Sequence, residues 1–326
     1  MDKATATFRR HGGRLATARA AFPDAPEPWL DLSTGISPYP WPTGRAPQGD
    51  LRRLPAPEAL AELEAVAGRA FGSPPQRVVA LAGADAALRL LPLLTGAPTV
   101  AIGSPTYSGH AEAWRAAGAE VAEVPLARLG RTEAKAAVIV HPNNPDGAIC
   151  EAATLADGRR WLIVDESFIE TMPALSLAGL DLPRTIVLRS FGKFYGLPGL
   201  RLGFLIAEPE VALRARRLTG DWPVSAQALA IGAAAYADQA FAARARARLA
   251  RAAARLDSLL TPHGFQVVGG TSLFRLTRSP DAARRFEILA RQGVLTRPFD
   301  HDPALLRFGL PAPGQWKRLA AALAQL

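Results

Sequence analysis

The sequence predicts an α/β protein with a large domain, built on a mainly parallel seven-stranded sheet sandwiched by helices, and a small α+β domain at the carboxyl terminus. The first observation is a series of short apolar runs that alternate with helical or loop segments. Runs with so few polar positions are typical of strands buried on both faces, as in a parallel sheet covered by helices. The second observation is a change after Glu208 to long helices and four strand-like runs. The seven runs are Val78 to Ala82, Thr99 to Ile102, Val121 to Val124, Ala137 to Val140, Trp161 to Val164, Thr185 to Leu188 and Leu202 to Ile206.

The composition indicates a folded globular chain. Its 326 residues are 49% hydrophobic and 21% charged, and this length suits a large domain with a smaller one. A net charge of +9 and a pI of about 10.5 would suit a nucleic-acid binder. The arginines, however, are scattered along alanine-rich helical segments and form no single block. We therefore expect no nucleic-acid partner, and a basic surface that is solvated and attracts anionic substrates.

The residue types argue against a disulfide, a metal site, a secretory signal and a membrane-spanning helix. Cys150 is the only cysteine, which excludes an intrachain disulfide and a multi-cysteine metal site. Residues Met1 to His11 have no apolar core, so we expect no secretory signal, and no run predicts a spanning helix. The histidines have no spacing typical of metal ligands, so no metal is predicted. These features favour a cytoplasmic protein without a membrane partner.

Three segments are predicted along the chain. Prolines interrupt residues 1–45, which are expected to be an N-terminal arm followed by irregular chain. Residues 46–207 form the large domain, which has a helix over Pro57 to Ala70, because its leucines and valine recur on one stripe. Residues 208–326 form the small domain.

The small domain is predicted to begin with helices. One covers Val211 to Leu218, and another covers Ala226 to Leu260 with a bend near Gly232. Four strand-like runs follow: Phe265 to Val268, Leu273 to Leu276, Val294 to Arg297 and Leu305 to Gly309.

Groups suited to a flat, phosphorylated ligand follow the predicted strands, at the sheet edge where parallel sheets bind ligands. Gly83 ends a strand and opens a helix, whose free amides near Ala84 and Asp85 form a phosphate cradle. The alternative there is a tight turn in which Asp85 balances the helix dipole. Tyr107 follows the next strand and offers a ring for stacking, or packs on the core.

Two more polar groups end later strands. Asn144, within the sequence His141 to Gly147, could donate its amide to a phenolate oxygen, although asparagines and prolines also make turns. Asp165 ends a buried strand, where a carboxylate is costly unless it meets a cation such as a protonated pyridine nitrogen. A magnesium ligand or a structural ion pair are alternatives, and the lack of a GxxxxGK[ST] phosphate loop lowers the magnesium interpretation.

The sequence Leu188 to Phe204 reads LRSFGKFYGLPGLRLGF. It offers the primary amine of Lys193 to an aldehyde, and the guanidinium of Arg201 with serine hydroxyls to a phosphate. Taken alone, it is also explained as a basic loop between two strands. The order of all these groups along the chain favours a pyridoxal phosphate site.

With these residues in this order, nearly the whole chain resembles the fold-type I pyridoxal-phosphate enzymes of the aminotransferase class I/II group. The NNPDG and SFGKFYGLPGLRLGF sequences carry the resemblance. It implies a fold-type I transferase-like architecture, and a homodimer, because active sites of this family lie between two subunits. It also implies roles for cofactor-binding residues: Lys193 would bond to the cofactor aldehyde, Asp165 would pair with the ring nitrogen, Asn144 would hold the ring hydroxyl oxygen, Tyr107 would stack on the ring, and Ala84, Asp85, Ser190 and Arg201 would contact the phosphate.

The sequence departs from this family at two positions. Phe168 stands where relatives commonly have a tyrosine that touches the ring hydroxyl oxygen, so one hydrogen bond is missing. Leu54 precedes Pro55 where relatives often have a tyrosine that reaches the phosphate across the dimer, which puts that contact in doubt.

Segments near both ends of the chain suggest the reaction. His11-Gly12-Gly13 and Asp31 to Pro38 resemble the L-threonine-O-3-phosphate decarboxylases of cobalamin biosynthesis, as does Phe168. The resemblance implies a small phosphorylated amino-acid substrate, whose α-carboxylate is held by Arg307 in the sequence Leu305 to Gly309. The resemblance also implies that His11 binds the substrate phosphate. The alternative is that His11 is a solvent-exposed residue of the arm. The other residues implied to bind substrate are Ser33, Thr34, Gly35 and Asn144.

Two other functions stay open from sequence. A histidinol-phosphate aminotransferase shares the overall plan and also takes a phosphorylated amine. A binding or regulatory protein could keep the fold without catalysis, although the presence of Lys193, Asp165, Asn144 and Arg201 argues against it.

Overall fold

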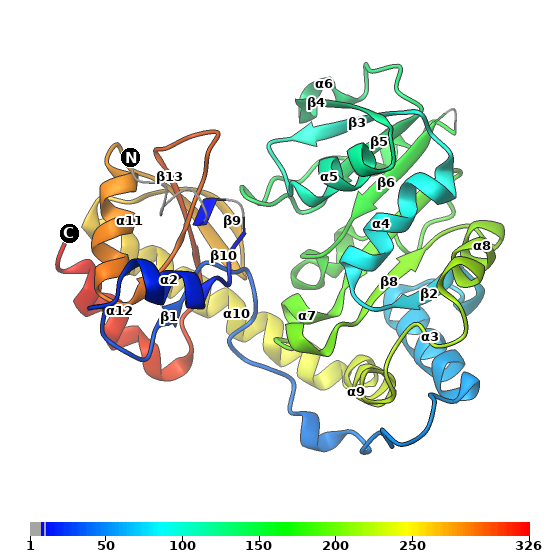
Figure 1. The fold of residues 1–326 in the computed structure, drawn as a ribbon, viewed down its shortest axis with the longest axis horizontal. Helices are drawn as coiled ribbons and strands as arrows, with labels where there is room; N and C mark the ends of the chain where they lie inside the picture. The colour runs from blue at the N-terminus through cyan, green and yellow to red at the C-terminus, as the bar shows by residue number, and fades with distance from the viewer. Residues whose placement is uncertain (1–7, 10, 159) are drawn as a thin grey trace. The chain divides into compact units, whose positions relative to one another are not determined.

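The computed structural model describes residues 8–9, 11–158 and 160–326. What we expect of Met1 to His11 therefore falls mostly outside the described residues. The chain divides into two compact units, which Figure 1 shows. The larger unit comprises Pro40–Asn144 and Ala148–Arg244; the smaller comprises Met1–Tyr39, Pro145–Gly147 and Ala245–Leu326. The predicted domain boundaries at residues 45 and 207 stay a prediction.

The larger unit is built on a seven-stranded sheet in the order β2-β8-β7-β6-β5-β3-β4. Neighbouring strands are parallel except at β8, which is antiparallel to both β2 and β7. This confirms the mainly parallel seven-stranded sheet. The strands are β2 (Val78–Leu81), β3 (Thr99–Ser104), β4 (Glu120–Pro125), β5 (Ala136–Val140), β6 (Trp161–Asp165), β7 (Thr185–Ser190) and β8 (Gly203–Ile206).

Helices cover both faces of this sheet, so its central strands are buried. Side chains of α4 (Ala84–Thr95), α5 (Gly109–Ala116) and α8 (Pro209–Thr219) form one core with the strands. On the other face, Phe71 of α3 (Pro57–Phe71) packs edge-on against Phe204 of β8 and Tyr236 of α9 (Ala226–Ala237). Two short helices, α6 (Leu126–Leu129) and α7 (Phe191–Phe194), follow strand ends.

The long helix predicted over Ala226 to Leu260 is two helices, α9 and α10 (Gln239–Leu260), and the predicted bend near Gly232 is wrong. The break lies at Asp238, whose carboxylate accepts a hydrogen bond from the Phe241 amide at 2.9 Å and so starts α10. Gly232 serves packing instead: a Cβ there would lie 2.5 Å from Leu202 and 2.9 Å from Leu63. The missing side chain lets α9 approach α3 closely.

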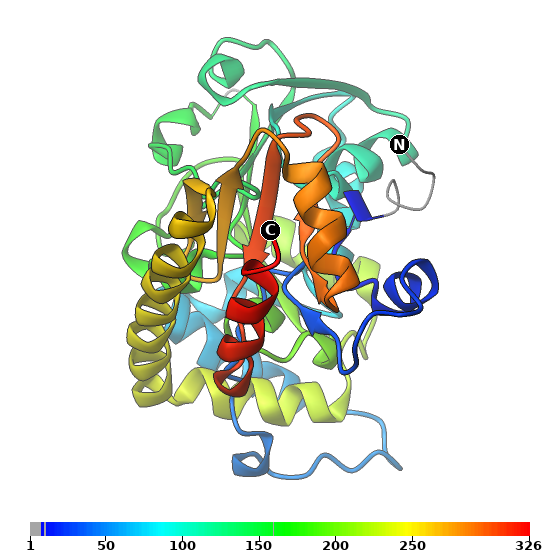
Figure 2. The ribbon, with the colours of Figure 1, turned by 90° about the vertical axis from the view of Figure 1, so that its left-hand side faces the viewer.

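The smaller unit contains a four-stranded antiparallel sheet in the order β12-β13-β10-β9. In Figure 2, α10, α11 and α12 lie over its strands. The predicted strand Val294 to Arg297 divides into β11, which pairs with β1 in a separate sheet, and β12. The elements are α2 (Leu15–Ala21), β1 (Leu30–Asp31), β9 (Gln266–Thr271), β10 (Phe274–Arg278), α11 (Ala282–Arg291), β11 (Val294–Leu295), β12 (Arg297–Pro298), β13 (Leu305–Gly309) and α12 (Trp316–Leu323).

Among the helices of the described residues, none has both the length and the apolar character to cross a membrane.

Candidate active site

The predicted cofactor residues of the larger unit gather at one edge of its sheet. Strands β3, β5, β6 and β7 are neighbours and run parallel, so their carboxyl ends meet at the same edge. Tyr107 follows β3, Asn144 follows β5, Asp165 ends β6 and Ser190 ends β7. We call these residues, with Ala84, Asp85, His110, Lys193 and Arg201, the cofactor cluster.

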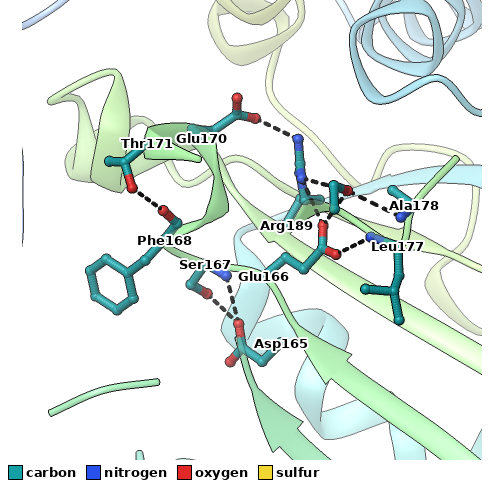
Figure 3. A network of polar contacts seen from close by, with 10 residues as sticks. Asp165, Glu166, Ser167, Phe168, Glu170, Thr171, Leu177, Ala178 and Arg189 are labelled. Carbon is teal, nitrogen blue, oxygen red and sulfur yellow. Dashed lines mark hydrogen bonds and ion pairs between the residues drawn. The ribbon is translucent and has the colours of Figure 1, made fainter. Parts of the chain in front are cut away.

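Asp165 is the buried anion of the cofactor cluster, with 4% of its surface exposed. Its Oδ1 accepts hydrogen bonds from the amide and the hydroxyl of Ser167, at 2.9 and 2.5 Å (Figure 3). Its Oδ2 lies 2.9 Å from Nε2 of the fully buried His110. Burial raises the pKa of Asp165, but the hydrogen bond and charge of His110 and the bonds from Ser167 outweigh it, so the pKa is lowered. Asp165 is therefore ionised at neutral pH, and Oδ2 keeps a lone pair for one more donor.

His110 was not predicted as a site residue. The sequence gives no spacing between His110 and Asp165 that points to contact, because they meet only where the start of α5 reaches the end of β6. The imidazole also contacts Tyr107, with ring centroids 6.2 Å apart in an edge-to-face arrangement. The pKa of Tyr107 is raised by burial and by the nearby carboxylates of Asp85 and Asp165. The phenol of Tyr107 is thus neutral, and its ring is available as an apolar face.

The loop after β5, which carries Asn143 and Asn144, is hydrogen-bonded to the loop after β3. The Asn143 side chain accepts a hydrogen bond from the Thr106 hydroxyl at 2.7 Å and donates one to the Pro105 carbonyl at 3.0 Å. Its backbone amide donates to the Ala148 carbonyl at 2.9 Å. Asn144 is the next residue and is half-buried.

A cationic cradle lies at the start of α4. Gly83 has φ +93°, and a Cβ there would lie 2.7 Å from Nη2 of Arg201. Arg201 itself has φ +54°, a left-handed conformation that is costly for a residue with a side chain. Gly203 pairs with both Leu81 and Ser190, and a Cβ on it would lie 2.3 Å from the Ala84 amide. The cradle thus combines helix amides, a guanidinium and a serine, as a phosphate requires.

The Asp85 side chain points to a different partner. Its carboxylate bonds with Nε of Arg89 at 3.0 Å, one helical turn along α4. Only its backbone amide is therefore suited to a phosphate.

Lys193 lies on the four-residue helix α7. Its amine lies 5.8 Å from the centre of the Phe168 ring, which is 4% exposed. Phe168, which stands where relatives commonly have a tyrosine, thus places an apolar ring without a hydroxyl beside the Lys193 amine. Leu54, the other departure, is 68% exposed.

A buried charge network supports the ends of β6 and β7, as Figure 3 shows. Arg189 donates to Glu166 at 2.7 Å and to Glu170 at 2.9 Å, and all three side chains are buried. Glu166 follows Asp165, and Arg189 precedes Ser190. Because neighbouring residues of a strand point to opposite faces, this network holds the strand ends from behind the cofactor cluster.

Arg307 of the smaller unit is buried, with 5% exposed, and donates to the Ser33 carbonyl at 2.9 Å. The Ser33 hydroxyl donates to Asp31 at 2.5 Å and accepts from the Gly13 amide at 2.8 Å. Its hydrogen is therefore used within the protein, and direct binding of substrate by Ser33 stays a prediction. A Cβ on Gly12 would lie 2.3 Å from the Ser33 carbonyl, so glycine is needed beside the half-buried His11.

A second arginine lies opposite Arg307. Arg297 of β12 pairs in register with Arg307 of β13. Burial, and then the charge of Arg297, lower the pKa of Arg307 to about 9. Two arginines paired across the strands, one of them buried, bring positive charges together, an arrangement that suits an anion. We call Arg297, Arg307, Ser33 and His11 the anion cluster.

Two residues near the anion cluster were predicted to bind substrate. A Cβ on Gly309 of β13 would lie 2.3 Å from the Thr34 carbonyl, so the chain at Thr34 lies directly against that strand. Gly35 is the next residue and is buried. Their roles stay a prediction.

Across residues 8–9, 11–158 and 160–326, no three histidine, cysteine, aspartate or glutamate side chains are grouped so as to hold an ion.

Comparison with known proteins places this arrangement in a family. Residues 28–326 match the family described as aminotransferase class I and II. A threonine-phosphate decarboxylase from Pseudomonas aeruginosa is 40% identical over 324 residues, 96% of either chain, and one from Sinorhizobium sp. is 38% identical over 97% of this chain and 98% of its own. A histidinol-phosphate aminotransferase from Thermobifida fusca is 33% identical over 90% of this chain and 88% of its own.

Solved structures share the fold. Histidinol-phosphate aminotransferase from Sinorhizobium meliloti, solved in complex with pyridoxal 5'-phosphate, superposes with a TM-score of 0.82 at 20% identity, covering 94% of this chain and 93% of its own.

Proposed function

Because residues 28–326 match its family model, the chain belongs to the aminotransferase class I and II family, and we propose that it is a pyridoxal-phosphate-dependent decarboxylase of L-threonine O-3-phosphate. The product is (R)-1-amino-2-propanol O-2-phosphate, and the pathway is cobalamin biosynthesis. The observation that carries the proposal is the 40% identity to a threonine-phosphate decarboxylase over 96% of both chains.

The cofactor cluster fits pyridoxal phosphate. The Arg201 guanidinium lies against Gly83, at the start of α4, where a Cβ on the glycine would approach it to 2.7 Å, and this position suits the cofactor phosphate. Asp165 is buried and ionised, with a lone pair left for the protonated ring nitrogen. Asn144 would hold the ring hydroxyl oxygen, Tyr107 would lie on the ring face, and Lys193 would bond to the aldehyde.

The anion cluster suits a substrate with two anionic groups. We assign the α-carboxylate to Arg307, whose planar guanidinium matches a carboxylate. We assign the substrate phosphate to Arg297, with His11 and the backbone near Thr34 and Gly35. Arg297 supplies the arginine that sequence did not identify for this phosphate.

The residues divide the chemistry between them. When bound, pyridoxal phosphate supplies an electron sink for the electron pair left behind as carbon dioxide departs. Arg307 and Arg297 would hold the two anionic ends of the substrate and so restrict the orientation of its carboxylate. Asp165 keeps the ring nitrogen protonated, because its charge is stabilised by His110 and Ser167. The Lys193 amine would hold a proton and return it to the α-carbon of the substrate.

Phe168 supports decarboxylation over transamination only by resemblance. Its ring beside Lys193 provides no hydroxyl, so the ring hydroxyl oxygen of the cofactor is left to Asn144.

We propose a homodimer as well, which the exposed apolar side chains of Leu51 (67%), Leu54 (68%) and Trp222 (54%) support. We also propose a cytoplasmic location.

The test separates decarboxylase from aminotransferase. Purified protein with pyridoxal phosphate receives threonine phosphate without a keto acid, or histidinol phosphate with 2-oxoglutarate. We expect carbon dioxide from the first mixture and no glutamate from the second. Reduction with borohydride should attach the cofactor to the peptide that contains Lys193, and Lys193→Ala should abolish this adduct. A protein that takes up no cofactor would be a binding or regulatory protein instead.

A further inference from the structure

Asn143 is buried, with 8% exposed, yet it is not among the residues expected to touch the cofactor. Its side-chain amide bridges two loops that do. The carbonyl accepts from the Thr106 hydroxyl at 2.7 Å, and the amino group donates to the Pro105 carbonyl at 3.0 Å. Tyr107 follows Thr106 directly, and Asn144 follows Asn143 directly. One side chain therefore joins the two segments that carry the ring face and the amide donor.

The rest of the loop leaves little freedom to Asn143. Its backbone amide is held by the Ala148 carbonyl at 2.9 Å, which closes the turn around Asn144. Strands β3 and β5 are parallel neighbours, so their loops emerge side by side from the same sheet edge. The pairing of β3 with β5 extends only to Ile102 and Val138. Beyond these residues, the hydrogen bonds of the Asn143 side chain hold the two loops together.

We propose that Asn143, together with Thr106, is a positioning residue that sets the distance between Tyr107 and Asn144, and thereby the fit of the pyridine ring between them. This inference rests on the proposed function, since it concerns a cofactor that this cluster binds. An asparagine is suited to the task because one amide offers a donor and an acceptor at a fixed separation. Aspartate has the same shape but would turn an anionic oxygen toward the Pro105 carbonyl.

The test compares holoenzymes of the wild type, Asn143→Asp, Thr106→Val and Thr106→Ser. Thr106→Ser keeps the hydroxyl and serves as the matched control for Thr106→Val, which removes it at constant shape. Measurements are the dissociation constant for pyridoxal phosphate, the visible circular dichroism of the bound cofactor, and thermal unfolding of the cofactor-free proteins. We expect about tenfold weaker cofactor binding and an altered visible signal for Asn143→Asp and Thr106→Val, with Thr106→Ser near wild type.

A double variant provides a second measure. If the two side chains act through one bridge, Asn143→Ala combined with Thr106→Val should weaken cofactor binding little more than Asn143→Ala alone. If the role is purely structural, the variants should lower the unfolding temperature of the cofactor-free protein but leave the affinity for pyridoxal phosphate and the visible signal within twofold of wild type. That result would overturn this inference and leave the proposed function intact. A wild-type protein that binds no pyridoxal phosphate would overturn the proposed function, and the inference with it.

Discussion

His110 and Asp165 are in direct contact, with Nε2 of the buried imidazole 2.9 Å from Oδ2 of the carboxylate. Because an ionised carboxylate only accepts, Nε2 carries the hydrogen. Burial alone would raise the pKa of Asp165, and the contact with His110 is the first of the interactions that reverse this. His110 thus keeps Asp165 charged for a cationic partner.

Replacing His110 with phenylalanine should therefore raise the pKa of Asp165. We expect kcat/KM to fall by about 10- to 100-fold, and the acid limb of its pH profile to move to higher pH. In the wild type, the stability contributed by Asp165 is present above pH values near 4 and lost as the pH falls, because its folded-state pKa lies below the ordinary value of 3.8. The exposed His301 provides the control, because His301→Phe should change neither the pH profile of kcat/KM nor the pH dependence of stability. An unmoved acid limb in His110→Phe would contradict the role of His110.

The facing arginines of the anion cluster predict that an anion stabilises the protein. Inorganic phosphate should raise the unfolding temperature of the holoenzyme, because it offsets the repulsion between Arg297 and Arg307. The effect should weaken at alkaline pH, because burial and the charge of Arg297 lower the pKa of Arg307 to about 9. Arg297→Met should remove most of it, whereas Arg284→Met, whose side chain is 71% exposed, should not. Thermal scans at several phosphate concentrations measure this, and equal stabilisation in all three proteins would count against the anion cluster.

Gly269 of β9 should not tolerate a side chain. A Cβ there would lie 2.2 Å from the Asp146 carbonyl, which accepts the Gly270 amide at 2.7 Å. Gly269→Ala should lower the free energy of unfolding by about 1–3 kcal/mol. It should also weaken cofactor binding, since Asp146 lies two residues after Asn144. In the matched control Gly314→Ala, the new Cβ meets no atom within 4 Å. Urea unfolding and cofactor titration of both variants check this, and equal behaviour would refute it.

Arg189 holds two buried carboxylates, and its loss leaves both without a cation. We expect Arg189→Met to lower the free energy of unfolding by about 3–5 kcal/mol. Adding Glu166→Gln and Glu170→Gln should recover part of this loss, because the uncompensated charges are removed. Arg52→Met, whose side chain is 89% exposed, should change stability by less than about 0.5 kcal/mol. Denaturant unfolding compares these three variants with the wild type. A loss in Arg189→Met no larger than in Arg52→Met would show that the network is not stabilising.

The sequence was most informative where local pattern decides structure. Apolar runs such as Trp161 to Val164 predicted the central strands, since buried parallel strands have few alternatives. The polar residues that end those runs, Asp165 among them, fall at one sheet edge because of chain direction alone.

Other features depend on contacts between distant segments and have no local signal. His110 meets Asp165 across 55 positions, and Arg297 faces Arg307 through a strand of two residues. The helix break at Asp238 was misplaced to Gly232 because a glycine that permits close packing and one that bends a helix look alike in sequence. Register and packing distance decided these cases.

The central claim is that the protein removes the carboxylate of threonine phosphate and puts a proton in its place. The most direct measurement is the reaction of holoenzyme with L-threonine O-3-phosphate in deuterium oxide without a keto acid, followed by quantification of carbon dioxide and NMR of the product. We predict one carbon dioxide for each aminopropanol phosphate, which retains its amine and carries one deuterium on the former α-carbon. A product that has lost its amine, or turnover only when 2-oxoglutarate is added, would contradict the account.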